Sequence, residues 1–202
     1  MRGTSQIATS WSSPLDDWLR AVVETPGLTA LSLEDARQVL LEDSLRALDL
    51  VRAHEGAVVD VGSGGGAPGI PIAHTLRDRE VVLLEAEQRK CDFLEHWVPP
   101  NARVVWGRAE EQPTDWAGVA LAKALATPPV AAEWCLPLVR AGGIAILWVG
   151  ETAERDPVAR VAEQLGAELG DGPDGLYVLR KLRPTPEGFP RRAGVAKKRP
   201  LA

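Results

Sequence analysis

The chain has 202 residues, of which 45% are hydrophobic and 25% are charged, enough for one α/β domain with a full core. No stretch approaches the roughly 20 apolar residues that a membrane-spanning helix needs, and residues 1–13 lack the apolar stretch of a secretory signal. The only cysteines, Cys91 and Cys135, are too few for a disulfide framework, so we expect a cytoplasmic protein.

The net charge of −5 is distributed unevenly along the chain. Residues 183–202 carry six basic side chains against one acidic side chain, whereas the rest of the chain carries 17 basic and 27 acidic side chains. A basic tail on an acidic body is suited to contact phosphate. A solvated, disordered C-terminus is the alternative interpretation, and both stay open.

Two helical segments are predicted first, and together they form an N-terminal helical region over residues 1–54. Ser13 can cap the first helix, which should end at residues 25–27, where the sequence reads Thr-Pro-Gly. Ser32 and Asp35 form a second capping pattern. The apolar residues that follow it at helical spacing should line one packed face: Val39, Leu40, Leu41, Leu45 and Leu48.

From residue 57 the sequence changes to short apolar runs separated by helices. Continuous apolar runs indicate strands covered on both faces, which is typical of a mostly parallel sheet. The predicted strands are 57–61, 81–84, 104–106, 118–122, 144–149 and 176–179. The predicted helices are 69–77, 88–97, 129–139 and 153–165. We therefore predict one doubly wound, Rossmann-like α/β domain over residues 55–182, followed by a basic tail over residues 183–202.

A glycine-rich loop, VDVGSGGGAPGIP over residues 59–71, follows the first strand. It lies at the carboxyl edge of the sheet, where open α/β folds bind ligands. A P-loop is excluded, because Ile and Pro occupy the positions of its Lys and Ser/Thr. The spacing of Gly62, Gly64 and Ala67 is compatible with a dinucleotide site, although that motif alone is weak.

Acidic residues near this loop favour S-adenosylmethionine over a nicotinamide dinucleotide. Asp60 precedes the first glycine by two residues, and a carboxylate that faces the loop would repel a pyrophosphate but suit an ammonium and a sulfonium. Glu85 ends the second strand, where it can accept both hydroxyls of a ribose. Residues 107–111, which follow the third strand, lie where an adenine edge would be, and Trp106 is a weaker candidate for that pocket.

From about residue 40 to the end, the sequence resembles the bacterial RsmG (GidB) family, which methylates N7 of a guanine in 16S ribosomal RNA. The resemblance rests on DVGSGGGAPGIP at 60–71, LLE at 83–85, GRAEE at 107–111 and TPEGFPRRAG at 185–194. It implies a class I S-adenosylmethionine-dependent methyltransferase fold. The cofactor site that follows from the loop motif and the resemblance comprises Gly62, Ser63, Gly64, Ala67, Glu85, Ala109, Glu110 and Lys123.

Three positions depart from the family's pattern. Leu40 replaces a histidine and Val149 replaces a lysine. Lys123, also a candidate RNA contact, replaces an arginine and keeps the charge but not the planar fork of donors. Two alternatives therefore stay open, namely a divergent relative that binds the cofactor with little turnover and, because the body is acidic, a small-molecule methyltransferase.

Methylation of guanine N7 needs no general base, because N7 carries an in-plane lone pair and no proton. Orientation can supply most of the catalysis, so no catalytic residue is assigned. Cys91 and Cys135 fall in predicted helices and are interpreted as packing residues. The histidines are widely separated, so no metal site is expected. The expected partner is 16S ribosomal RNA or a small-subunit precursor, bound by a monomer without membrane contact.

Overall fold

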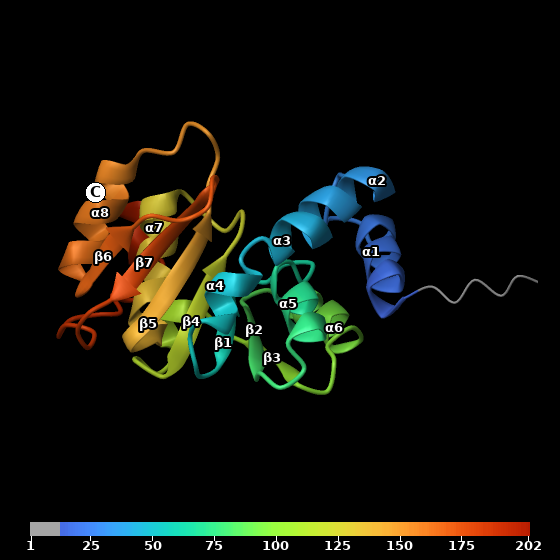
Figure 1. The fold of residues 1–202 in the computed structure, drawn as a ribbon, viewed down its shortest axis with the longest axis horizontal. Helices are drawn as coiled ribbons and strands as arrows, with labels where there is room; N and C mark the ends of the chain where they lie inside the picture. The colour runs from blue at the N-terminus through green and yellow to red at the C-terminus, as the bar shows by residue number, and fades with distance from the viewer. Residues whose placement is uncertain (1–12) are drawn as a thin grey trace, which may run out of the picture.

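A seven-stranded sheet forms the centre of the computed structural model, which describes residues 13–202 (Figure 1). Its strands are β1 Val58–Val61, β2 Val81–Glu85, β3 Ala102–Trp106, β4 Ala117–Ala122, β5 Val139–Trp148, β6 Ala167–Gly170 and β7 Leu176–Lys181. Their order in the sheet is β3-β2-β1-β4-β5-β7-β6. Strands β1 to β5 are parallel, and β7 is antiparallel to β5 and β6. The predicted doubly wound, mostly parallel sheet is confirmed.

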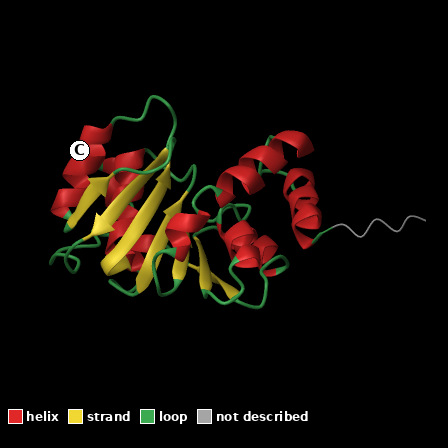
Figure 2. Cartoon of the chain, viewed as in Figure 1, coloured by secondary structure: helices red, strands yellow, loops and turns green. Residues whose placement is uncertain are grey.

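Helices cover both faces of this sheet (Figure 2). They are α1 Pro14–Glu24, α2 Leu33–Ala36, α3 Asp43–Leu45, α4 Leu48–Arg52, α5 Gly69–Thr75, α6 Gln88–Glu95, α7 Pro128–Cys135, α8 Arg155–Gln164 and α9 Val195–Lys198. Because side chains alternate along a strand, Val59 and Ala120 pack in the cluster with α7 and α8. Val58 and Leu121 pack in the opposite cluster with α1 and α5.

The first predicted helix is confirmed, but the second segment is not a continuous α-helix. Ser13 accepts a hydrogen bond from the Asp16 N–H in a capping box at the start of α1. After α2, the chain continues as a π-helix, η1, over Arg37–Glu42. A π-helix changes the angular spacing of side chains, so Val39 is 39% exposed while Leu41 is buried. The prediction that Val39 lies on the packed face was wrong.

The sheet differs from prediction in three main places, one of which is the start of β5 at Val139 instead of the predicted residue 144. Strand β6 was not predicted, because AELG is too short and too polar to resemble a buried strand. Strand β3 forms an edge of the sheet and is only partly buried, so the expectation of cover on both faces was wrong there. The predicted helix over residues 129–139 ends as α7 at Cys135 and is followed by a 3-10 turn, η3, over Leu136–Leu138.

The C-terminal tail lies against the body of the protein. Phe189 and Leu201 pack on the hydrophobic cluster under α7, and Ala196 in α9 is buried. The alternative of a disordered C-terminus is therefore wrong. Across residues 13–202, no helix has the length and apolar character needed to cross a membrane. Residues 1–12, where no secretory signal is expected, lie outside the described residues.

Candidate functional site

A cavity of about 530 Å³ opens at the carboxyl ends of β1, β2 and β4. One side, which we term the sheet-edge wall, consists of residues 61–65, 84–87 and 107–110. The facing helical wall consists of Val22, Leu28, Thr29, Leu31, Val39 and Leu40. The cavity brings together all eight residues of the predicted cofactor site, which are Gly62, Ser63, Gly64, Ala67, Glu85, Ala109, Glu110 and Lys123.

The glycine-rich loop turns sharply after β1. Gly62 and Gly64 have φ angles of +69° and +57°, a region that side chains with a Cβ rarely adopt. A Cβ on Gly62 would collide with Leu125, whereas the nearest atom to a Cβ on Gly64 would be 3.8 Å away. The N–H groups of Gly62 and Ser63 donate to the Leu84 carbonyl at 2.8 and 3.2 Å. The loop is thus tied to β2 and leaves open space above Gly64.

Glu85 joins the loop to the end of β2. Its side chain lines the cavity although the residue is only 6% exposed. One carboxylate oxygen accepts the Gly64 N–H at 2.8 Å, and the other accepts the N–H groups of Ala86 and Glu87 at 2.8 Å each. Hydrogen bonds to an ionised carboxylate are stronger than neutral ones. Glu85 is therefore a buried, oriented acid rather than a solvated loop residue.

Asp60 does not face the cavity, so that part of the sequence-based prediction was wrong. The residue is 1% exposed, and its carboxylate accepts the Gly69 N–H at 3.0 Å, in the first turn of α5. Side chains alternate along β1, and Asp60 shares the α5 face of the sheet with Val58. Burial, with a smaller contribution from the charge of Glu85, raises the pKa of Asp60 to about 7, against the opposing effect of hydrogen bonds from Gly69 and Ser63.

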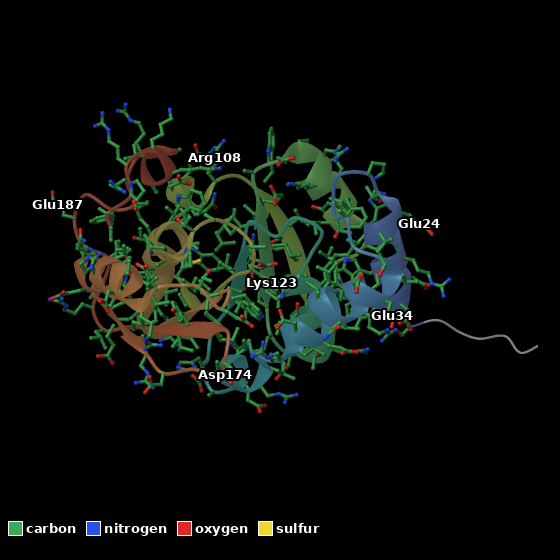
Figure 3. The ribbon with its side chains drawn as sticks, turned by 90° about the horizontal axis from the view of Figure 1, so that it is seen from above. Glu24, Glu34, Arg108, Lys123, Asp174 and Glu187 are labelled. Atoms are coloured by element: carbon green, nitrogen blue, oxygen red, sulfur yellow. The ribbon has the colours of Figure 1, made fainter. Side chains whose placement is uncertain are left out.

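Lys123 places a positive charge in the cavity beside the N-terminal helices. Its side chain is 10% exposed and forms an ion pair with Asp43, while its Nζ lies 5.6 Å from the centre of the Trp148 ring. Asp43 also pairs with Arg46 at 2.8 Å. Burial lowers the pKa of Lys123 to about 8. Figure 3 shows Lys123 near the middle of the molecule. Its partner Asp43 is the first residue of α3.

The loop after β3 contacts the C-terminal tail. Ala109 is buried, and Glu110 accepts the Gly194 N–H at 2.9 Å, a contact that the sequence did not predict. Trp106 lies outside the cavity lining and is 66% exposed, so its assignment to an adenine pocket was wrong. Its Nε1–H donates instead to the Ala86 carbonyl at 3.1 Å.

The helical wall was missed by sequence reasoning. Only Val22 of this wall lies in an α-helix, whereas the other residues lie in the connection between α1 and α2 or in η1, so no local motif marks them as cavity lining. Leu40, one of the departures from the family pattern, belongs to this wall. The wall meets the loop where Trp18, fully buried in α1, donates its Nε1–H to the Gly65 carbonyl at 2.8 Å. Only the fold brings these distant segments together.

Both cysteines are buried, as expected for packing residues. The Cys91 thiol donates to the Glu85 carbonyl at 3.4 Å, and Cys135 is fully enclosed in the cluster under α7. Burial raises the pKa of each thiol above its usual value. Because the thiolate is the nucleophilic form, neither side chain is suited to attack a substrate. Within residues 13–202, no three His, Cys, Asp or Glu side chains are grouped to hold a metal ion.

Comparison with known proteins identifies the family of this chain. The model of rRNA small subunit methyltransferase G (GidB) matches residues 24–165. The ribosomal RNA small subunit methyltransferase G of Rubrobacter xylanophilus is 37% identical over 193 residues, which cover 83% of this chain and 70% of that protein. Its counterpart from Symbiobacterium thermophilum is 35% identical over 215 residues, covering 92% and 87%.

The fold agrees with this relationship. A TehB-like SAM-dependent methyltransferase from Corynebacterium glutamicum superposes with a TM-score of 0.53 at 19% identity, covering 68% of this chain and 86% of that one. This likeness confirms the predicted class I methyltransferase fold. The family model and the two relatives together show that the chain belongs to the rRNA small subunit methyltransferase G family.

Proposed function

We propose that this protein transfers a methyl group from S-adenosylmethionine to N7 of a guanine in 16S ribosomal RNA. Its membership of a family named for small-subunit rRNA methylation supports the reaction and the substrate. The observation that carries the proposal is the convergence of all eight predicted cofactor residues on one cavity of the fold. A cavity of about 530 Å³ is within the size range of small-molecule sites.

The sheet-edge wall fits the polar end of the cofactor. The bare backbone around Gly64 leaves room for close approach. The Glu85 carboxylate accepts three backbone N–H groups and keeps one lone-pair site, on the oxygen bonded to Gly64, for a ribose hydroxyl. Ala109 and Glu110 would border the adenine in the loop after β3. We propose that these residues, with Gly62, Ser63, Ala67 and Lys123, hold the cofactor.

When bound, S-adenosylmethionine supplies an electrophilic methyl group. Guanine N7 offers a lone pair and no proton, so the chain has to orient the base and exclude water rather than supply a general base. The apolar residues of the helical wall are suited to exclude water. Lys123, paired with Asp43, is a charged group at the cavity that can contact RNA or cofactor. Residues 55–182 would thus catalyse the transfer, with residues 1–54 and 183–202 as flanking parts of a monomer.

A transfer assay tests this function. The protein is incubated with S-adenosylmethionine labelled in its methyl group and with small-subunit RNA that lacks the modification. Label should enter the RNA, and strand scission at N7-methylguanine should place it at one guanine. RNA that stays unlabelled over a range of salt concentrations would contradict the proposal, and label at a position other than N7 would contradict the assigned atom.

A relative that binds the cofactor with little turnover is a second candidate, favoured by Lys123. The Asp43 carboxylate already neutralises this side chain in the described structure, and lysine lacks the planar fork of the family's arginine. Calorimetry of cofactor binding, combined with the transfer assay, decides between the two candidates. Tight cofactor binding without transfer to any RNA would favour the second candidate, whereas transfer to the RNA would exclude it.

A further inference from the structure

The C-terminal tail is fastened beside the cavity at two points. The Arg191 guanidinium forms two contacts of 2.5 Å with the carboxylate of Glu133 on α7, and Glu133 is 3% exposed. A bidentate pair of this kind sets both distance and orientation. Three residues later, the Gly194 N–H donates to Glu110, which lines the cavity. Helix α9 follows directly and buries Ala196.

The start of the tail is anchored as well. Thr185 donates its backbone N–H and its hydroxyl to the Asp115 carboxylate at 2.9 to 3.2 Å. Lys181, fully buried at the end of β7, donates to the Leu136 carbonyl and to the Thr185 hydroxyl at 2.9 Å each. The tail is therefore a fixed part of the fold, and its exposed side chains have a defined position relative to the cavity.

The anchoring contacts use only one of the basic side chains near α9. Arg191 is consumed by Glu133, but Arg192, Lys197, Lys198 and Arg199 are exposed and have no ion-pair partner within residues 13–202. Arg108 is exposed at the cavity rim, two residues before Glu110, which accepts the Gly194 N–H directly ahead of α9. Figure 3 shows the labelled Arg108 on the side of the molecule where the C-terminal segment lies. These five residues, which we term the basic rim, concentrate positive charge on a protein whose net charge is −5.

We propose that the basic rim binds the phosphate backbone of the RNA substrate and sets the position of the RNA over the cavity. The proposal deepens the function given above and rests on it for the identity of the RNA. Phosphate contacts fix the register of a protein on a nucleic acid without reading its sequence. Because Glu110 and Glu133 hold the rim against the cavity, phosphates bound there would place nearby nucleotides at a fixed distance from the cofactor.

The acidic remainder of the protein strengthens this argument. Apart from the tail, the chain carries 17 basic and 27 acidic side chains, an acidic excess that disfavours RNA binding elsewhere on the protein. A small basic area beside the cavity would then both attract the RNA and orient it. The two adjacent arginines have different roles. Arg191 holds the tail in place through Glu133, whereas Arg192 is exposed to solvent.

A charge-reversal pair tests the rim against a matched control. The test variant carries Lys197→Glu and Lys198→Glu. The control carries Arg160→Glu and Arg183→Glu, which change the net charge equally at exposed positions outside the cavity lining. For each protein, affinity for small-subunit RNA is measured against salt concentration. Cofactor affinity and thermal unfolding are measured in parallel.

The test variant should bind RNA at least about tenfold more weakly at low salt, with a flatter dependence on salt. Its cofactor affinity and melting temperature should match those of the control, which should bind RNA within about threefold of wild type. If the test variant fails to fold, the exposed single change Arg192→Glu, compared with Arg183→Glu, replaces it. Equal RNA affinity in test and control variants would overturn the proposal.

The outcomes also separate this inference from the proposed function. If wild type methylates RNA and both double variants bind RNA equally, the rim assignment alone fails. If wild type binds RNA through the rim but never methylates it, the proposed activity fails and the rim stands. A wild-type protein that neither binds nor methylates small-subunit RNA would overturn both.

Discussion

The sheet-edge wall presents bare glycine backbone and the oriented Glu85 carboxylate to the cavity, whereas the helical wall presents mostly apolar side chains. The first wall is made by three loops that follow parallel strands, and hydrogen bonds to Leu84 and Glu85 hold it in place. The second wall is held by packing on the sheet and by the bond from Trp18 to Gly65. The sheet-edge wall is thus suited to polar recognition, and the helical wall is suited to exclude water.

This difference predicts that the two walls respond differently to substitution. A side chain added on the sheet-edge wall would occupy the space proposed for the cofactor. A change in the helical wall acts first on how the N-terminal helices are held against the loop. The predictions below test that distinction, from the largest expected effect to the smallest.

Gly64→Arg should reduce the affinity for S-adenosylmethionine by more than roughly 100-fold. The new side chain would enter the cavity, because nothing lies closer than 3.8 Å to the added Cβ. The matched control is Gly142→Arg, which has a φ of +83°, open space around its Cβ and a position outside the cavity lining. Both variants bear a similar backbone strain of about 1–3 kcal/mol. Calorimetric titration should separate them, and equal affinities would show that the cofactor is placed wrongly.

Trp18→Phe should lower the free energy of unfolding by about 2–3 kcal/mol, because it leaves the Gly65 carbonyl without its donor and opens a small cavity. Trp106→Phe also removes an indole donor to a carbonyl, but at a residue that is 66% exposed, so its cost should stay within about 1 kcal/mol. Denaturant titration measures both. Similar losses in the free energy of unfolding for the two variants would indicate that the Trp18 contact with Gly65 does not hold the helical wall to the loop.

Asp60→Asn, a substitution beneath the cavity, should change how the free energy of unfolding depends on pH. The folded-state pKa of Asp60 is raised to about 7, so between pH 4 and 7 the folded protein keeps a proton that the unfolded chain releases. The contribution of this carboxyl to stability therefore falls as the pH rises through that range. Asparagine does not titrate, so the variant's stability relative to wild type should increase from pH 4 to 7 and then level off. A difference that stays constant or shrinks with pH would contradict this placement.

Local patterns in the sequence were enough to predict much of the sheet-edge wall. Continuous apolar runs identified β1, β2, β4 and part of β5, and the glycine loop with Glu85 indicated where a ligand would lie. Parallel strands bring their carboxyl ends to the same edge, so motifs that follow different strands meet there. This geometry agrees with the family resemblance, which implied that residues as distant as Gly62 and Glu110 belong to one site.

Asp60 and Val39 show where such patterns are insufficient. The direction of the Asp60 side chain depends on the alternation along β1 and on the helix that covers that face. The exposure of Val39 depends on a π-helical turn, which hydrophobic spacing does not reveal. Both predictions named the correct segment and misplaced the side chain.

By itself, the sequence determined most of the order of strands and helices apart from β6 and η1, the loop at the sheet edge and the charge of the tail, because these depend on neighbouring residues or on composition. Only the tertiary structure decided that the N-terminal helices complete the cavity and that the tail is held beside it. Those outcomes depend on contacts between distant segments, such as Trp18 with Gly65 and Glu110 with Gly194. Such contacts form when the sheet brings separate segments together, and no local pattern encodes them.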